Sequence, residues 1–498
     1  MSDITLPLQY TYIEALPEGC IEWQPDTIAT PELVYLNRPL AKQLGLELES
    51  ADDKTLPSLF AGNQLPGTIK PFAQAYTGHQ FGHLAPMLGD GRAVVLGEWL
   101  DSDENRWDLA LKGSGRTPFS RGGDGKAALG PMLREVLLSE ALYHLGIATT
   151  RSLAVVATNE QVYRQQALPG AILTRVAASH IRIGTFEYFA GQNDVANLKT
   201  LADYTLNRHY PDLAQQHNPY LAMLEAVIER QAELVASWMN HGFIHGVMNT
   251  DNITLSGETI DYGPCAFMEQ YKPGAVFSSI DQHSRYAYAN QPKIMHWNLA
   301  RFAETLLPLL DGEDEQKVEV LTETINRFPD MYRRYLLQGQ RQKLGLFYSE
   351  DNNDRALTER WLDLLHQNKV DFTLAWRYLS DVLRGNTEPL LKLFDDEDGL
   401  NSWLKDWQQR LHNDQPDSAE FSPAQRAAKM NTINPFLIAR NHMVEAALSA
   451  ASDENDYSLF NDLLSALQQP FEENAQTRPF ATPAPEEFTE RYQTFCGT

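Results

Sequence analysis

The stretch His245–Gly263 reads HGVMNTDNITLSGETIDYG, and it carries an amide and a carboxylate at a defined spacing. Asp261 follows Asn252 by nine residues, and the short runs 253–255 and 259–260 between them are expected to form strands. An amide oxygen and a carboxylate oxygen on adjacent loops are hard ligands that suit Mg²⁺, with phosphates and waters completing its shell. An ordinary hairpin with an Asn in its turn is the alternative, but the joint pattern favours a metal site.

The same stretch matches the spacing of the catalytic and metal-binding loops of protein kinases, H-R-D-x-x-x-x-N followed by D-F-G. His245 aligns with the first histidine, and Asn252 and Asp261 align with the two metal ligands. The position of the catalytic aspartate holds Val247, which cannot accept a proton, and Asp251 is the nearest candidate base. Phosphoryl transfer depends mainly on positioning and charge stabilisation, so a displaced base is compatible with group transfer.

A strand and a helix further upstream are expected to supply a buried ion pair. The run 106–112 (RWDLALK) should form a strand that places Lys112 on the face opposite its large apolar side chains. The segment 126–146 should form a helix that is apolar nearly all round and therefore largely buried. Glu135 has no cationic neighbour along that helix, and burying an unpaired carboxylate is costly. We expect Glu135 to pair with Lys112; a glutamate at the rim that reaches water is the alternative.

Glycines and cations gather around this strand and helix. The two glycine-rich stretches are 89–92 (GDGR) and 113–126 (GSGRTPFSRGGDGK), and the cations interleaved with them are Arg92, Arg116, Arg121 and Lys126. Glycine lets backbone N–H groups approach phosphates closely, although turns and a flexible loop would give the same composition. Arg175 and Arg182 form a further cationic pair. Arginine binds phosphate bidentately, but a surface salt bridge for each explains them equally well.

Composition limits the partners and the compartment. The chain has 498 residues, with 41 Lys plus Arg against 66 Asp plus Glu, so its net charge is −25. Such a surface repels nucleic acid and anionic lipid, and a phosphate ligand must be held by a local cluster of cations. The three cysteines (Cys20, Cys265 and Cys496) and the lack of a signal peptide or membrane-spanning run favour a cytoplasmic protein. Nothing in the sequence requires more than a monomer.

The order of the predicted elements indicates an α+β fold with the bilobal layout of a protein kinase. Residues 1–70 should form an N-terminal extension, 71–190 a small sheet-plus-helix lobe, 191–330 a large mostly helical lobe, and 331–498 a helical C-terminal region. Its tail, from about residue 470, should be a strap or a mobile end. The expected strands of the small lobe are 92–100, 106–112, 152–158 and 170–176.

Five strings taken together point to one family. They are YTGHQFG (76–82), LGDGR (88–92), LKGSGRTPFSRGGDGKAAL (111–129), HGVMNTDN (245–252) and DYGP (261–264). In combination they resemble the selenoprotein O family of protein adenylyltransferases. The resemblance is dense over about 70–300 and looser over the helical remainder.

The resemblance implies a kinase-like fold that binds ATP inverted, with the γ-phosphate buried and the α-phosphate facing the acceptor. AMP would pass to Ser, Thr or Tyr hydroxyls of protein substrates, and pyrophosphate would leave. Asn252 and Asp261 would bind Mg²⁺ or Mn²⁺, and Asp251 would accept the proton. The residues that would form the nucleotide site are Gly89, Gly91, Arg92, Lys112, Asp124, Gly125, Arg175 and Arg182, with Glu135 as the partner of Lys112.

Two other functions stay open from the residues alone. One is ordinary phosphotransfer by a kinase, and the other is a non-catalytic ATP-binding scaffold. Val247, at the position of the kinase base, argues against the first. The complete set of Asp251, Asn252 and Asp261 argues against the second, because a scaffold has no need of full metal ligation.

A redox role for the C-terminus is a further implication of the resemblance. Some members carry selenocysteine near the C-terminus, where this chain has Cys496, and some are thought to link a C-terminal Cys to one beyond the Asp-x-Gly motif. Phe277–Ser279 occupies the stretch where that partner is expected, and it has no cysteine. Cys265 is an alternative partner, and a buried inert thiol is its other interpretation.

Overall fold

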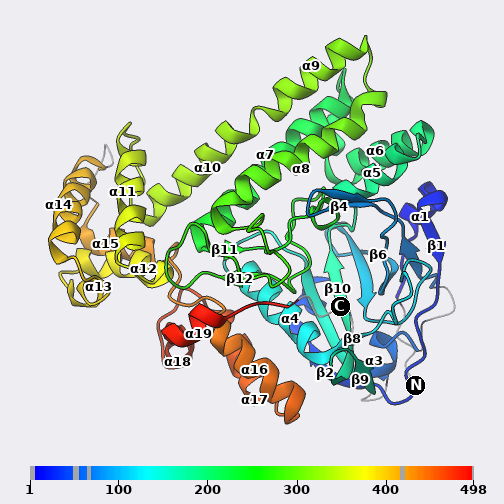
Figure 1. The fold of residues 1–498 in the computed structure, drawn as a ribbon, viewed down its shortest axis with the longest axis horizontal. Coiled ribbons are helices and arrows are strands. Elements are labelled where there is room, and N and C mark those ends of the chain that lie inside the picture. The colour runs from blue at the N-terminus through cyan, green and yellow to red at the C-terminus, as the bar shows by residue number, and fades with distance from the viewer. Residues whose placement is uncertain are drawn as a thin grey trace.

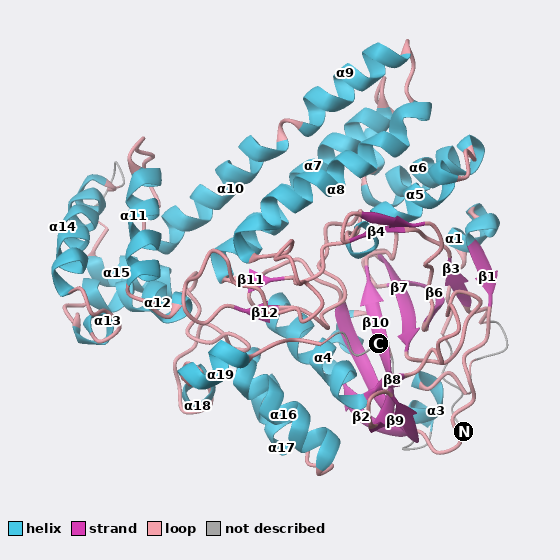
Figure 2. Cartoon of the chain, viewed as in Figure 1, coloured by secondary structure: helices cyan, strands magenta, loops and turns pink. Residues whose placement is uncertain are grey.

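The computed structural model describes residues 6–46, 48, 55–63, 65, 69–415 and 421–495. It is a mixed fold with one large antiparallel sheet and many helices (Figure 2). The sheet order is β1-β3-β6-β7-β10-β9-β2, and β8 pairs with β10 off this path. The strands of the sheet are β1 Cys20–Glu22, β2 Glu32–Leu36, β3 Phe72–Gln74, β6 Ala93–Leu100, β7 Arg106–Lys112, β8 Ala127–Ala128, β9 Arg151–Tyr163 and β10 Ala167–Ala177.

The four strands expected from the sequence form the middle of this sheet. β7 has the expected bounds and β6 begins one residue later than expected. β9 and β10 are longer than expected because they pair with each other as a hairpin out to Tyr163 and Ala167. The N-terminal stretch 1–70 contributes β1 and β2, which extend the sheet beyond β3 and β9. The division of the chain into four parts stays a prediction.

The buried helix of the sequence analysis is α4, Leu129–His144, which begins three residues later than expected. The reason is that Ala127 and Ala128 form β8 and pair with β10 before the chain turns into the helix. α4 packs on β9 and β10 on one side and on α16 and α17 on the other (Figure 1). Burial on both sides explains why its sequence is apolar nearly all round.

The rest of the chain is mainly helical, as expected. The helices of the first 310 residues are α1 Thr11–Ala15, α2 Arg38–Gln43, α3 Thr55–Phe60, α5 Ile183–Gly191, α6 Val195–His209, α7 Pro219–His241 and α8 Gln291–Leu306. The later helices are α9 Asp314–Ile325, α10 Phe328–Lys343, α11 Asp354–Gln367, α12 Phe372–Leu383, α13 Glu388–Leu391, α14 Glu397–Asn413, α15 Pro423–Asn431, α16 Asn441–Asp453, α17 Ser458–Leu467, α18 Arg478–Ala481 and α19 Glu486–Arg491. No helix among the described residues is long and apolar enough to cross a membrane.

The expectation of two short strands at 253–255 and 259–260 is wrong. Thr254 and Thr259 make single bridges to Arg182 and Thr149 instead of pairing with each other. Each run finds its backbone partners in a different neighbouring segment, so no hairpin forms. A two-stranded sheet does lie close by, between β11 (Phe243–Ile244) and β12 (Ala266–Phe267).

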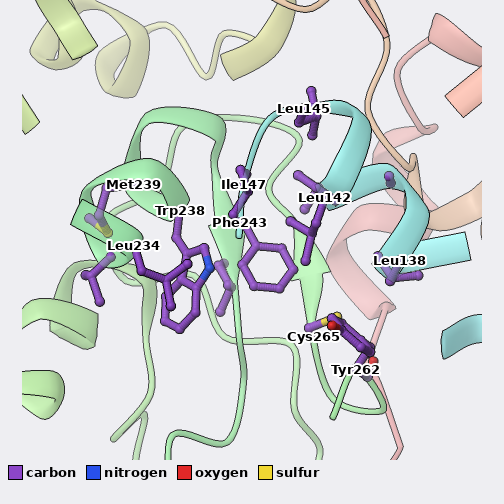
Figure 3. Packing of buried hydrophobic residues seen from close by; sticks show 14 of the residues in the cluster. Leu138, Leu142, Leu145, Ile147, Leu234, Trp238, Met239, Phe243, Tyr262 and Cys265 are labelled. Atoms are coloured by element: carbon purple, nitrogen blue, oxygen red, sulfur yellow. The ribbon is translucent and has the colours of Figure 1, made fainter. Parts of the chain in front are cut away.

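A continuous core joins α4 to the helical region. Figure 3 shows Leu138 and Leu142 of α4 facing the group that contains Trp238 of α7, Phe243 and Tyr262. Because Tyr262 belongs to the Asp-Tyr-Gly motif, the core fixes the start of that loop against α4. The helix that carries Glu135 and the loop that carries Asp261 are therefore held together by apolar packing.

The tail is a strap as far as residue 495. Thr494 bridges Ser278 in parallel, and its Oγ1 donates to the Pro264 carbonyl at 2.7 Å. The tail therefore lies along the segment that follows the Asp-Tyr-Gly motif. Cys496 lies outside the described residues.

Candidate nucleotide site

Lys112 and Glu135 form the ion pair expected from the sequence. The Lys112 Nζ donates to Glu135 Oε1 and, at 2.7 Å, to Asp261 Oδ1. Both members of the pair are buried, so the alternative of a glutamate reaching water is wrong. Lys112 thus joins α4 to the Asp-Tyr-Gly loop, which lies 149 residues further along the chain.

Arg175 completes the contact between the same two carboxylates. Its Nη2 donates to Glu135 Oε2 at 2.8 Å and to Asp261 Oδ1 at 2.7 Å. The strand register explains this position: Leu173 lies opposite Lys112 and Arg175 opposite Ala110, so both cations point to the face that α4 covers. The alternative of a surface salt bridge for Arg175 is wrong, because its side chain is buried.

Arg182 approaches the site from the N-terminus of α5. Its Nη1 donates to the Asp251 carbonyl at 2.8 Å and lies 3.5 Å from Asp261 Oδ2. Its guanidinium also lies over the Tyr76 ring, 4.6 Å from the centroid. Arg182 is buried, so a surface salt bridge is wrong here as well.

Asp261 is the centre of this cluster. Its backbone has a φ of 65°, a left-handed conformation that aspartate tolerates better than most residues. Burial opposes its ionisation, but Arg175, Lys112 and Arg182 together hold the pKa of its carboxyl well below the usual range. The pKa of Lys112 is lowered by burial and by the neighbouring Arg175. In direct contact three cations meet two carboxylates here, and the carboxylates of Asp90 and Asp251 lie within electrostatic range of Arg182.

Asn252, which follows Asp251 in the chain, is the second residue predicted to bind the metal. Its Nδ2 donates to the Val247 carbonyl at 2.9 Å, which fixes the amide. Within the described ranges its Oδ1 makes no hydrogen bond, so that oxygen is free to coordinate. No group of three or more His, Cys, Asp and Glu side chains in the described part of the chain could hold a metal alone. A cation bound by Asn252 and Asp261 therefore fits if phosphate oxygens and waters supply the remaining ligands.

Asp251 lies under a hairpin that the sequence analysis did not predict. β4 (Gly78–Gln80) pairs with β5 (His83–Ala85), and a Cβ built on Gly78 would collide with Asp251 Oδ1. Burial raises the pKa of the Asp251 carboxyl to about 6, and a hydrogen bond from Gln80 partly offsets this. Oδ1 itself is buried and has no partner in the described structure.

The hairpin is fastened to the loop that carries Asp251. The His79 amide donates to Thr250 Oγ1 at 2.7 Å, and that hydroxyl donates to Glu187 Oε2 at 2.5 Å. The other oxygen of Glu187 lies 2.6 Å from His79 Nδ1. The sequence offered the string YTGHQFG (76–82), which contains β4, as a signal for this region. Its runs are too short to show the alternation that predicts a hairpin.

The glycine-rich positions divide into two groups. Gly89 and Gly91 pack closely on Phe119, and Arg92 is near enough to Lys112 to contribute to its lowered pKa. Asp124 instead pairs with Arg164, whose Nη1 lies 2.8 Å from its Oδ2. Gly125, next to it, has a φ of 68° and leaves no room for a Cβ against the Gly115 carbonyl. The structure thus brings Arg92 to the cluster, whereas Asp124 faces a different partner.

Cys265 is a buried thiol. Its Sγ donates to the Tyr262 carbonyl at 3.2 Å, and burial raises the pKa of the thiol to about 12. A thiol with so high a pKa is a poor nucleophile at neutral pH. The described structure gives Cys265 no disulfide partner.

The structure thus brings Lys112, Arg175 and Arg182 to the partly exposed carboxylate of Asp261, with Glu135 as a second partner of Lys112 and Arg175. The family model described as protein adenylyltransferase SelO matches residues 12–468, and the chain belongs to this family. It is 54% identical to the protein nucleotidyltransferase YdiU of Chromobacterium violaceum, over 97% of this chain and 100% of that protein. It is 50% identical to that of Rhizobium meliloti, over 95% and 96%. The chain is accordingly a nucleotidyltransferase, and the family resemblance found in the sequence is confirmed.

Proposed function

We propose that this enzyme transfers AMP from ATP to hydroxyl groups of Ser, Thr or Tyr on other proteins, on a kinase-like bilobal fold. The single observation that carries the proposal is the convergence of Lys112, Arg175 and Arg182 on Asp261, beside Asn252 and Asp251. The sheet with α4 would form the small lobe, and α5 to α8 with the loops between them would belong to the large lobe. The curated relatives are named for nucleotidyl transfer to protein, which supports the same activity.

The reaction we propose is a displacement at the α-phosphorus. The acceptor hydroxyl oxygen forms a bond to phosphorus, the bond to the bridging oxygen of the β-phosphate breaks, and pyrophosphate leaves with that electron pair. The hydroxyl proton passes to Asp251, whose raised pKa suits a base working near neutral pH. Asn252 and Asp261 would hold Mg²⁺ or Mn²⁺, which would neutralise phosphate charge.

The positive cluster supports the inverted orientation of ATP. Lys112 and Arg175 are buried and donate to Asp261 Oδ1, whereas Arg182 lies 3.5 Å from Asp261 Oδ2 and donates to the Asp251 carbonyl. A terminal phosphate enclosed by the buried cations would leave the α-phosphate nearer Asp251. Gly89, Gly91 and Arg92 would line the same pocket.

The test is to incubate the protein with ATP labelled at the α- or the γ-phosphate, together with acceptor protein and divalent metal. Label transferred from the α-position only supports AMP transfer. Label from the γ-position would instead show a kinase, and retention of both labels in free nucleotide despite ATP binding would show a scaffold. Asp251→Ala, Asn252→Ala and Asp261→Ala should each abolish transfer of the α-label, and full activity of all three would refute the site.

A further inference from the structure

A surface groove lies beside the hairpin that covers Asp251. It has a volume of about 520 Å³ and lies between the hairpin, the loop before α8 and the first turns of α8. The lining side chains used below are Phe81, Ile280, His283, Arg285, Lys293 and Ile294. None of these residues belongs to the nucleotide site described above.

The groove is attached to the catalytic loop through Asn249. The Phe81 amide donates to Asn249 Oδ1 at 3.0 Å, and the Tyr286 hydroxyl donates to the same oxygen at 2.6 Å. Asn249 stands two residues before Asp251 in the chain. A segment bound in the groove would therefore lie next to the loop that holds the proposed base.

Two cations of the groove have no acidic partner. In the described part of the chain, no carboxylate lies within 4.0 Å of the charged groups of Arg285 or Lys293. Asp281 also lines the groove, but its two oxygens accept from the backbone amides of Arg285 and Tyr286, at 2.9 and 2.8 Å. These bonds orient Asp281 and shape the loop but leave its charge in place, so the groove carries two cations against one carboxylate.

Arg285 is held in place by aromatic rings. Its guanidinium lies 4.9 Å from the centroid of the Trp297 ring and 5.7 Å from that of Tyr286. Stacking of this kind orients the guanidinium without neutralising it. In a chain with a net charge of −25, a groove with two cations and one carboxylate is a local exception that favours an anionic ligand.

Apolar side chains accompany the cations. Ile280, in the groove, is 48% exposed, and Leu84 and Met87, on and just after β5, are 53% and 52% exposed. An exposed apolar side chain, Ile280, in the same groove as Arg285 and Lys293 matches a protein segment better than a free phosphate.

We propose that this groove docks the acceptor protein through an extended segment that carries acidic side chains and an apolar one next to the modified hydroxyl. The proposal rests on the proposed function for the identity of the occupant as acceptor. The expected substrates are hydroxyl side chains flanked by acidic residues. An acceptor with basic surroundings would be disfavoured by Arg285 and Lys293.

The first test measures binding directly, without nucleotide. Three fluorescent peptides are compared by anisotropy at low salt; they share a Ser and a Leu and carry flanking Glu, Gln or Lys residues. The Glu peptide should bind at least about tenfold more tightly than the Gln peptide, and added salt should weaken it. Equal binding of all three peptides, or no binding of any, would overturn the proposal.

Charge-reversal variants test whether the peptide binds at Lys293 and Arg285. Lys293→Glu should weaken binding of the Glu peptide about tenfold and strengthen that of the Lys peptide, and Arg285→Glu should act in the same direction. Lys293 is exposed on α8, so its variant should fold even if the Arg285 variant does not. Lys405→Glu, an exposed lysine of α14, is the matched control and should leave binding unchanged. An equal loss in this control would show a general charge effect and refute the groove.

Transfer of α-label to the same peptides separates the two proposals. Lys293→Glu should raise the KM for the Glu peptide about tenfold and leave the KM for ATP unchanged. Selective binding of the Glu peptide without any label transfer would support docking in the groove and refute AMP transfer. Label transfer at equal rates to all three peptides would support AMP transfer and refute docking in the groove.

Discussion

Two buried ionic clusters in this molecule have similar geometry but a different balance of charge. In the nucleotide site, Lys112, Arg175 and Arg182 surround Asp261, whose side chain is 23% exposed. In the second cluster, Arg440 at the start of α16 binds Glu269 and Asp371, and all three side chains are closed off from solvent. The first joins three cations to two carboxylates in direct contact, and its Asp261 carboxylate is partly open to solvent. The second has one cation for two carboxylates and no opening, which is the pattern of a structural tie.

The second cluster joins three elements that are far apart in the sequence. Asp371 caps α12 by accepting from the Leu374 amide at 2.8 Å, and Arg440 Nη1 donates to Asp371 Oδ2 at 2.6 Å. Glu269, just after β12, binds the same guanidinium nitrogen. Burial and pairing alone therefore do not mark a functional site. An unbalanced charge that can be reached by a ligand does.

The largest effect should come from Asp261→Asn. Removing the carboxylate charge takes away the centre of the cation cluster and the proposed metal ligand, so α-label transfer should fall about 10²–10³-fold or more. Initial rates with α-labelled ATP measure this. Asp314→Asn, an exposed carboxylate of α9, is the matched control and should keep full activity. Activity within a few-fold of the original would show that Asp261 is a structural residue like Asp371.

Arg440→Met should have the next largest effect, and on stability instead of chemistry. It leaves two buried carboxylates without a counter-charge, which should cost about 3–5 kcal/mol of the free energy of unfolding. Guanidinium unfolding curves measure the loss. Arg360→Met, from the exposed pair with Asp406, should cost less than about 1 kcal/mol. Equal stability of the two variants would contradict the structural role of Arg440.

The sequence could predict the contacts that follow from local pattern. Glu135 stands in an apolar helix without a cationic neighbour, so a partner from another element was required, and alternation along 106–112 pointed to Lys112. The contact between Arg175 and Asp261 could not be predicted from the sequence. It depends on the register of β10 against β7 and on the core that holds the Asp-Tyr-Gly loop on α4.

The failures have equally physical causes. The runs 253–255 and 259–260 look like strands, but their backbone groups bond to residues near 182 and 149. The hairpin over Asp251 consists of two three-residue strands, too short for alternation to show. In both cases the secondary structure depends on backbone partners from distant parts of the chain, and a single sequence does not show which residues these are.

A third buried site, at Lys343, sharpens the comparison because this cation pairs with no carboxylate in the described structure. Its Nζ donates to the Asn240 carbonyl, and burial lowers its pKa to about 7. Between pH 7 and about 10.5 the unfolded chain keeps a proton on this amine that the folded chain has lost, so raising the pH should favour the folded protein. This contribution decreases as the pH falls from about 10.5 and is absent below about 7.

Unfolding of the original protein and of Lys343→Met over pH 6.5–10 measures the effect. The stability of the original protein relative to the variant should increase with pH across this range. Lys429→Met, a cation on the face of α15, should leave the pH dependence unchanged. A parallel pH dependence in the original protein and Lys343→Met would show that Lys343 stays charged when folded, supported by the rings of Phe372 and Trp376.

The smallest effect should come from Asp124→Ala, which tests where the nucleotide site ends. The family resemblance places Asp124 at the nucleotide, yet its partner is Arg164 in a partly exposed pair, which should be worth less than about 1 kcal/mol of stability. If Asp124 only anchors the glycine-rich loop, Arg164→Ala should lower ATP affinity by the same few-fold factor, as measured by calorimetry. A loss of tenfold or more in Asp124→Ala alone would place its carboxylate at the ligand. The boundary of the functional cluster would then lie beyond the three cations that meet at Asp261.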